Sequence, residues 1–173
     1  GVRIILVDRP DLTQSQIRLG HIGMPHAHPD YLPFEVMNYI LGAGGFASRL
    51  MRRIRSELGY TYGIRGSLEP RKHPGPFIIS TFTPTETTFP CVQEIFSVIR
   101  SFIAQGATDQ EREEAVNFLT GSYPMKFETL SQIAQRIIQA ELHGLELDTL
   151  SAYPQKVSAV TLADIARSAR HPL

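Results

Sequence analysis

The chain has 173 residues, of which 42% are hydrophobic, and its 17 Lys and Arg residues balance its 17 Asp and Glu residues. This length and composition suit one globular domain with a full core. The zero net charge argues against an electrostatic nucleic-acid binder, and no stretch approaches the roughly 18 apolar residues that span a bilayer. Both ends resemble cuts, with no signal peptide at the start, so we expect residues 1–173 to be one domain of a longer protein.

The first part of the chain carries strand and helix patterns in turn. Polar and apolar residues alternate in part over residues 14–24, which predicts a half-buried strand, and residues 2–7 predict another. Asp30 is placed to cap a helix that runs to about Leu41. The glycine run at residues 42–45 then ends this helix.

A second helix is expected over residues 47–58. Its leucine and isoleucine residues, spaced four apart, form a buried stripe, and Arg49 and Arg52 fall on the opposite, solvated face. Residues 60–68 and 76–83 predict two more strands, joined by a turn.

Helical patterns dominate the second half of the chain. The expected helices cover residues 89–105, 130–143 and 150–160, and two more begin at capping boxes at Thr108 and Thr161. Strands early and helices late predict an α+β fold, with an antiparallel or mixed sheet and helices packed on one face. The single cysteine, Cys91, excludes an internal disulfide framework, and its helical pattern favours a buried structural thiol.

The junction between the second helix and the following strand holds an arginine and a tyrosine. Arg55 falls on the last helical turn and Tyr62 a few residues into the strand, so both side chains can lie at the edge of a cleft. A guanidinium binds a carbonyl or carboxylate, and a phenol can donate to a developing oxyanion. The spacing also allows a structural role, in which Arg55 pairs with Glu57 or Glu69 and Tyr62 packs with its hydroxyl satisfied.

Several short motifs occur in a characteristic order. Residues 44–50 read Gly-Gly-x-x-Ser-Arg-Leu, and Ile-Arg and then Gly-Tyr-x-Tyr follow. Further matching segments lie at residues 13–20, 38–42, 121–124 and 160–165. Together they resemble the C-terminal, second-half domain of the pitrilysin/insulinase-type zinc metallopeptidases, the family of the mitochondrial processing peptidase. The resemblance runs from about residue 6 to residue 172.

The resemblance implies a zinc-free half of a zinc peptidase. In that family two homologous halves, in one polypeptide or in two subunits, enclose a chamber. One half binds zinc through a His-x-x-Glu-His helix, whose Glu acts as general base on the zinc-bound water. The six histidines of this chain never form that motif. Zn is therefore expected in the partner half, in cis or in trans, and a peptide or protein is the implied substrate.

The resemblance also assigns roles to residues of this chain. It implies that Arg55 binds the substrate backbone and that Tyr62 donates a hydrogen bond in the transition state. It places Gly44, Gly45 and Ser48 beside the substrate path. We therefore expect these five residues to form the candidate site.

The chain departs from the family pattern at two positions. Ser56 replaces a common Glu, which bears on how Arg55 is oriented. Tyr60 replaces a common Leu and offers a rival phenol, because strand alternation would place it on the same face as Tyr62.

Other interpretations stay open beside the peptidase half. Members of the family also serve as non-catalytic scaffolds, such as the core proteins of respiratory cytochrome complexes. A stand-alone peptide-binding module could use an open sheet edge. His26 and His28, between two prolines, could hold a metal weakly, but their setting favours a surface loop with solvated histidines.

Overall fold

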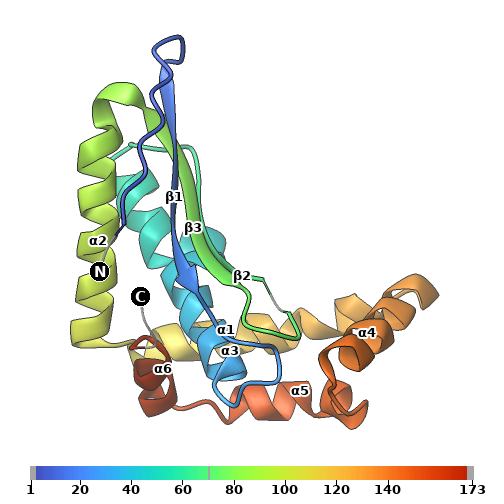
Figure 1. Cartoon of the computed structure of the whole chain (residues 1–173). Helices are drawn as coiled ribbons and strands as arrows, with labels where there is room; N and C mark the ends of the chain where they lie inside the picture. Colours follow the sequence, from blue (N-terminus) through green and yellow to red (C-terminus); the bar gives the residue numbers. More distant parts are fainter. Residues whose placement is uncertain (1–2, 70, 171–173) are drawn as a thin grey trace.

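The computed structural model describes residues 3–69 and 71–170 (Figure 1). Its strands are β1 (Gln14–Ile22), β2 (Ile64–Leu68) and β3 (Pro76–Pro84). Its α-helices are α1 (Tyr31–Asn38), α2 (Thr88–Gln105), α3 (Asp109–Gly121), α4 (Leu130–His143), α5 (Asp148–Ser158) and α6 (Leu162–Ser168). Shorter helical segments are the π-helical η1 (Tyr39–Ala43) and η3 (Met51–Glu57) and the 3-10 turns η2 (Gly45–Ala47), η4 (Thr85–Thr87) and η5 (Tyr123–Phe127).

The three strands form one antiparallel sheet in the order β1-β3-β2. Leu19 of β1 and Gly66 of β2 both lie opposite Ile79 of the central strand β3. Along β3, residues such as Phe77 and Ile79 are buried, and the residues between them are only half-buried. Because alternate residues of a strand point to opposite faces, one face of the sheet is covered and the other is more open.

The helices cover one face and one end of this sheet. In Figure 1, α2 runs along the sheet and the cyan segments η1 and η3 lie behind it, whereas α3 to α6 gather beyond its lower end. One cluster of buried apolar side chains joins the layers and includes Phe34 of α1, Phe77 of β3 and Phe102 of α2. The predicted α+β fold, an antiparallel sheet with helices packed on one face, is confirmed.

Two glycines allow the first helical segment to approach the sheet closely. Gly42 lies in η1, and a Cβ atom there would be 2.8 Å from the backbone nitrogen of Gly66 in β2. Beside this contact, the Nδ2 of Asn38 donates to the Gly66 carbonyl at 3.1 Å. The glycine loop that follows η1 is thereby held against the sheet.

The strand expected at residues 2–7 is wrong for the residues that the structure describes. Residues 3–8 carry no strand, and Ile4 and Leu6 are 86% and 87% exposed. Val2 lies outside the described residues. A strand needs a neighbouring ladder to satisfy its backbone groups, and no strand of the described chain pairs with this segment. The second pair of strands is confirmed, although β2 begins at Ile64 rather than at residue 60.

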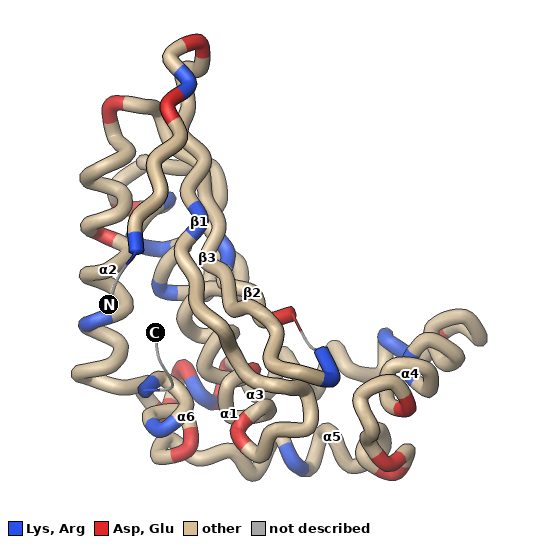
Figure 2. The backbone as a smooth tube through the Cα atoms, in the orientation of Figure 1, with Lys and Arg blue, Asp and Glu red and all other residues tan. Residues whose placement is uncertain are grey.

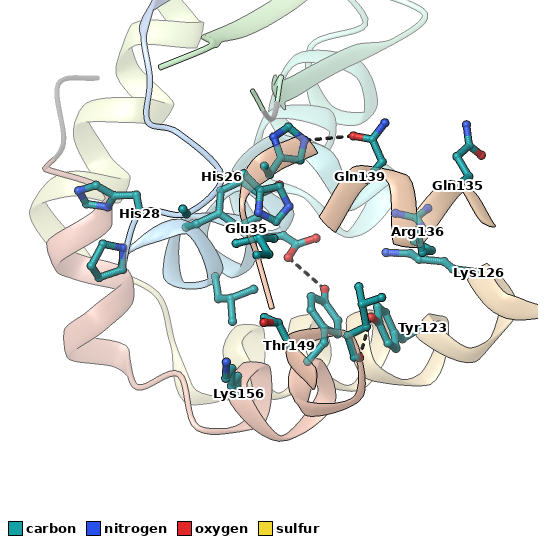
Figure 3. A pocket seen from close by; sticks show the side chains of 18 residues that line it. His26, His28, Glu35, Tyr123, Lys126, Gln135, Arg136, Gln139, Thr149 and Lys156 are labelled. Atoms are coloured by element: carbon teal, nitrogen blue, oxygen red, sulfur yellow. Dashed lines mark hydrogen bonds between the residues drawn. The ribbon is translucent and has the colours of Figure 1, made fainter. Parts of the chain in front are cut away.

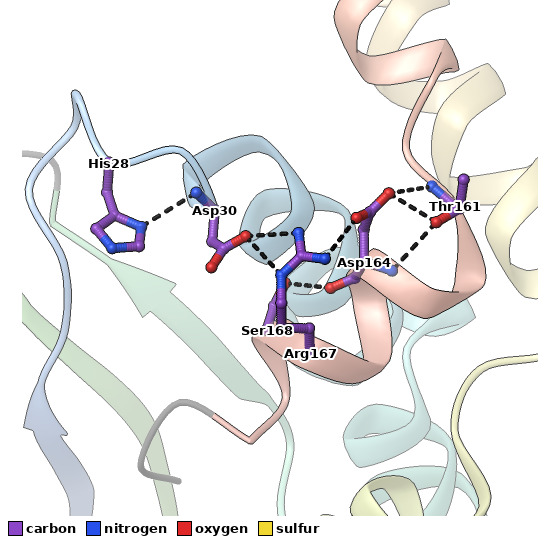
Figure 4. A network of polar contacts seen from close by, with 6 residues as sticks. All are labelled: His28, Asp30, Thr161, Asp164, Arg167 and Ser168. Atoms are coloured by element: carbon purple, nitrogen blue, oxygen red, sulfur yellow. Dashed lines mark hydrogen bonds and ion pairs between the residues drawn. The ribbon is translucent and has the colours of Figure 1, made fainter.

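The helix starts follow the predicted chemistry in part. The capping boxes at Thr108 and Thr161 are confirmed, and a third, which the sequence analysis missed, begins α4 at Thr129. Asp30 precedes α1, but its side chain caps nothing. Instead its Oδ1 accepts from the Nε and Nη2 of Arg167 at 3.0 and 2.7 Å (Figure 4). The prediction failed there because an arginine 137 residues away offers two charged donors.

The distribution of charged residues and the apolar character of the helices agree with the composition of the sequence. Acidic and basic positions are interspersed along the backbone in Figure 2. Among the helices that the structure describes, none combines the length and apolar character needed to cross a membrane. Cys91 is fully buried in α2, as predicted, and this burial raises the pKa of its thiol.

Candidate functional site

The glycine loop between η1 and η3 is shaped by a buried serine. Ser48 is fully buried, and its hydroxyl donates to the Gly45 carbonyl at 2.7 Å and accepts from the Met51 backbone N–H at 3.4 Å. Gly45 has φ +57°, which glycine adopts without strain. The Gly44 backbone N–H donates to the Tyr39 carbonyl at 2.9 Å. Gly45, Phe46 and Ala47 are the exposed residues of this loop and Gly44 is half-buried, while the Ser48 side chain supports the loop from inside.

Arg55 and Tyr62 lie together, as their sequence positions predicted. Arg55 is on η3, and its guanidinium carbon is 5.0 Å from the centroid of the Tyr62 ring. On the other side the same guanidinium lies 4.5 Å from the centroid of Phe46, in the glycine loop. Two aromatic rings thus hold this guanidinium by cation–π contacts.

The structural alternative for Arg55 is wrong. Glu57 pairs with Arg53 at 3.0 Å, and Glu69 pairs with Arg71. Over residues 3–69 and 71–170, Arg55 makes no ion pair within 4 Å. Its hydrogen-bonding groups are therefore free to meet another molecule.

Tyr62 is directed outward by its neighbours. Its side chain is 78% exposed, whereas Tyr60 is half-buried against the core. Between them, the Thr61 hydroxyl is buried and donates to the Gly63 carbonyl at 3.0 Å, while Thr81 of β3 donates to Thr61 at 2.9 Å. Because residues 60–63 form no strand, the alternation argument for Tyr60 does not apply. Tyr62 is the accessible phenol.

Phe46 belongs to this site, although the sequence analysis did not single it out. It lies in η2 and is 67% exposed, an unusual position for a large apolar side chain. An aromatic residue inside a glycine-rich loop is the signal that could have identified it.

Arg49 is not the solvated residue that the helical pattern predicted. Its side chain is 18% exposed and donates to both carboxylate oxygens of Glu111, at 2.7 and 2.6 Å. The prediction failed because α3 brings Glu111 to this face of the helical segment. Arg52 is exposed, as expected.

The described side chains of this chain do not form a site that fits a zinc ion. In the part of the chain that the structure describes, no group of three or more His, Cys, Asp or Glu side chains could hold a metal. The histidine loop also differs from the prediction of two solvated rings. His26 is half-buried and stacks on Tyr31 at 4.1 Å and on His143 at 4.8 Å between ring centroids. His28 accepts a hydrogen bond from the Asp30 backbone at 3.1 Å.

Comparisons with known proteins identify the family. The model of the peptidase M16 inactive domain matches residues 2–119. A Helicobacter pylori protein named Non-peptidase homolog YmxG is 33% identical over 144 residues, which are 80% of this chain and 33% of that protein. The chain therefore spans about a third of the length of this curated relative.

Solved structures share the fold. The peptidase M16 inactive domain from Pseudomonas fluorescens has a TM-score of 0.86 and 26% identity, over 92% of this chain and 38% of that one. A protease from Helicobacter pylori has a TM-score of 0.83 and 16% identity, again over 92% and 38%. At that identity the second structure supports the fold alone. These matches confirm the resemblance read from the motifs: the chain belongs to the peptidase M16 family, in which it forms an inactive domain.

Proposed function

We propose that this chain is the substrate-enclosing half of a zinc-dependent peptidase, and that it supplies Arg55 and Tyr62 to an active site completed by a zinc-binding half. The observation that carries the proposal is the contact of the half-buried Arg55 with the exposed Tyr62 beside the glycine loop. An arginine without a carboxylate partner and an exposed phenol suit a surface that receives a substrate. We assign the zinc chemistry to the other half, because residues 3–69 and 71–170 hold no group of three or more His, Cys, Asp or Glu side chains that could bind the metal.

The two side chains would act on different parts of a bound peptide. The planar guanidinium of Arg55 offers several N–H donors that can hold a backbone carbonyl. The Tyr62 hydroxyl donates where negative charge develops on the carbonyl under attack. Gly45 is exposed and brings backbone without a side chain to the same surface, which allows a substrate to approach closely, and Gly44 lies half-buried beside it. Ser48 supports that loop through its bond to Gly45.

The test is the Tyr62→Phe variant in the complete peptidase, assembled from this half and its zinc-binding half. Loss of one oxyanion donor lowers kcat by on the order of 10²-fold. We expect that loss with unchanged zinc content, measured by steady-state peptide hydrolysis and metal analysis. Tyr60→Phe is the matched control, because Tyr60 packs against the core and its hydroxyl has no proposed role. An unchanged kcat in Tyr62→Phe would contradict the proposal.

The second candidate is a scaffold or peptide-binding subunit without catalysis. It is favoured by the name of the Helicobacter pylori relative, a non-peptidase homologue. The same assay separates the two functions. If the wild-type assembly contains no zinc and cleaves no peptide, the scaffold is supported and the Arg55–Tyr62 pair has no catalytic role.

A further inference from the structure

A cavity lies away from the Arg55–Tyr62 site. Its volume is about 630 Å³, within the range of about 300–1,000 Å³ typical of small-molecule pockets. The loop before α1, α1 itself, η5, α4 and α5 all contribute to its lining (Figure 3). None of its lining residues comes from residues 44–62. The proposed peptidase role therefore leaves this cavity unexplained.

Aromatic rings form two walls of the cavity. On one side His26 is stacked between Tyr31 and His143. On the other side the rings of Tyr123 and Tyr153 stack with centroids 4.2 Å apart. Burial, and then the nearby His143, lower the pKa of His26, so its ring is an uncharged wall at neutral pH. A flat or apolar ligand body can lie between these two walls.

A single carboxyl group lies between the walls. Glu35 of α1 is half-buried, and its Oε2 accepts a hydrogen bond from the Tyr153 hydroxyl at 3.0 Å. Burial raises the pKa of Glu35, while Lys126, the Tyr153 hydroxyl and Arg136 favour its charged form. Both cations therefore act electrostatically on Glu35 across the cavity.

The cations that line the cavity outnumber its one carboxyl group. Lys126 and Arg136 extend toward Glu35 in Figure 3, and Lys156 is also part of the lining. The Lys126 Nζ is 5.5 Å from the centroid of Tyr123. Among the ion pairs within 4 Å that the described residues form, none involves these three cations. Three cations against one carboxylate leave the cavity positive, so it favours an anion.

We propose that this cavity binds a carboxylate attached to a flat, apolar body. Lys126 and Arg136 hold the carboxylate, and the body lies between the His26 and Tyr153 walls. Two sources offer this chemistry: a small aromatic acid, and the free carboxyl terminus of a peptide that ends in an aromatic residue. A cationic ligand is disfavoured because it would meet three positive side chains and a single carboxylate.

The experiment measures binding by calorimetry to the complete polypeptide that contains this chain. The probes are N-acetylphenylalanine and its amide, which share one body and differ in the carboxylate. We expect the acid to bind and the amide to bind at least tenfold more weakly. A short peptide ending in phenylalanine, with a free or an amidated terminus, forms the second arm. If only the peptide with the free terminus binds, the ligand is the end of a peptide. If N-acetylphenylalanine and this peptide both bind, the carboxylate on an aromatic body is sufficient for binding. Each result supports the proposal.

Variants then test the residues. Arg136→Gln and Lys126→Gln each remove a charge-assisted contact and should weaken binding of N-acetylphenylalanine by about tenfold or more. Glu35→Gln removes a like charge and should bind the acid at least as tightly, whereas a cation site would be lost. Arg100→Gln, an exposed arginine on α2, is the matched control, and thermal melting verifies that each variant is folded.

The proposed anion site would be overturned if the acid and the amide bound equally well. It would also be overturned if Glu35→Gln abolished binding of the acid while Arg136→Gln left that binding unchanged. Absence of binding by every probe would overturn it as well. None of these results depends on zinc or on peptide hydrolysis, so the outcome is independent of the proposed peptidase role.

Discussion

Arg49 connects three parts of the molecule through one side chain. Besides its two bonds to Glu111, it donates to the Gly106 carbonyl at 2.8 Å, and its guanidinium lies 4.8 Å from the centroid of Phe102. Glu111 is 17% exposed and also closes the capping box at Thr108. Burial raises the pKa of Glu111, but the bonds from Arg49 and Thr108 outweigh it and hold the value at about 2.

This low pKa predicts an acid-sensitive contribution to stability. A carboxyl whose pKa falls from 4.5 to about 2 on folding stabilises the native state above pH 4.5, and the contribution is lost as pH falls toward 2. Glu111→Gln should lower the free energy of unfolding at pH 7 by about 1–2 kcal/mol once solvent screening is allowed for. Urea unfolding at pH 7, 5 and 3 should show the difference between wild type and variant shrink with acid. Glu113→Gln, at an exposed position of α3, is the control, and a constant difference across pH would refute the assignment.

At the scale of elements, the contact of η1 with β2 depends on the absence of side chains. A Cβ atom at Gly42 would lie 2.8 Å from the Gly66 nitrogen and 3.1 Å from the Leu50 side chain. Backbone cannot move aside as a flexible side chain can. The distance between these two elements is therefore set by the two glycines.

We expect Gly42→Ala to be destabilising by about 1–3 kcal/mol, as for other overpacked sites. Gly121→Ala is the matched control, because a Cβ atom there meets nothing within 4 Å at the end of α3. The control should be neutral or gain up to about 1 kcal/mol from helix propensity. Chemical denaturation of both variants measures the two effects. Equal stabilities would mean that η1 shifts away from β2 at no cost.

Elements whose signals are local were predicted from the sequence, and those that depend on distant partners were not. Thr108 and Thr161 begin helices because the capping group lies three residues away. The strand expected at residues 2–7 is wrong over its described residues 3–7 because a strand needs a ladder partner, and the cap expected at Asp30 is wrong because Arg167 binds its side chain. In the candidate site, the sequence predicted that Arg55 and Tyr62 lie close together, because both residues flank the end of the second helix. The Phe46 contact and the cavity lined by Glu35 and Tyr153 were not predicted, because each joins segments that only the folded chain brings together.

At the scale of the whole molecule, two of the groups of exposed apolar side chains lie in the amino-terminal segment and on α4. Ile4 to Val7 in the amino-terminal segment are 72–87% exposed, and β1, which follows this segment in the chain, is an outer strand of the sheet. On α4, Leu130, Ile138 and Leu142 are 86%, 61% and 56% exposed. Surfaces of this kind favour contact with other protein, and open strand edges favour pairing between copies.

We therefore expect this chain, when prepared alone, to self-associate through the amino-terminal segment. Sedimentation velocity across a concentration series should show species larger than the monomer. Leu6→Lys places a charge on this segment and should shift the distribution toward monomer, because a charged side chain disfavours burial of this apolar surface between copies. Ile138→Lys makes the same change on α4 and should have less effect. The reverse order would assign self-association to α4.

The ion pair of Asp30 with Arg167 has a consequence for synthesis. It joins the start of α1 to α6, and these residues are separated by 137 positions. At about 5–20 residues per second on a ribosome, roughly 7–27 s pass between the synthesis of the first residue and that of the second. During that interval α6 cannot yet cover α1. A nascent chain thus carries an open apolar helix face for many seconds, and a chaperone that binds such faces would have time to act on it.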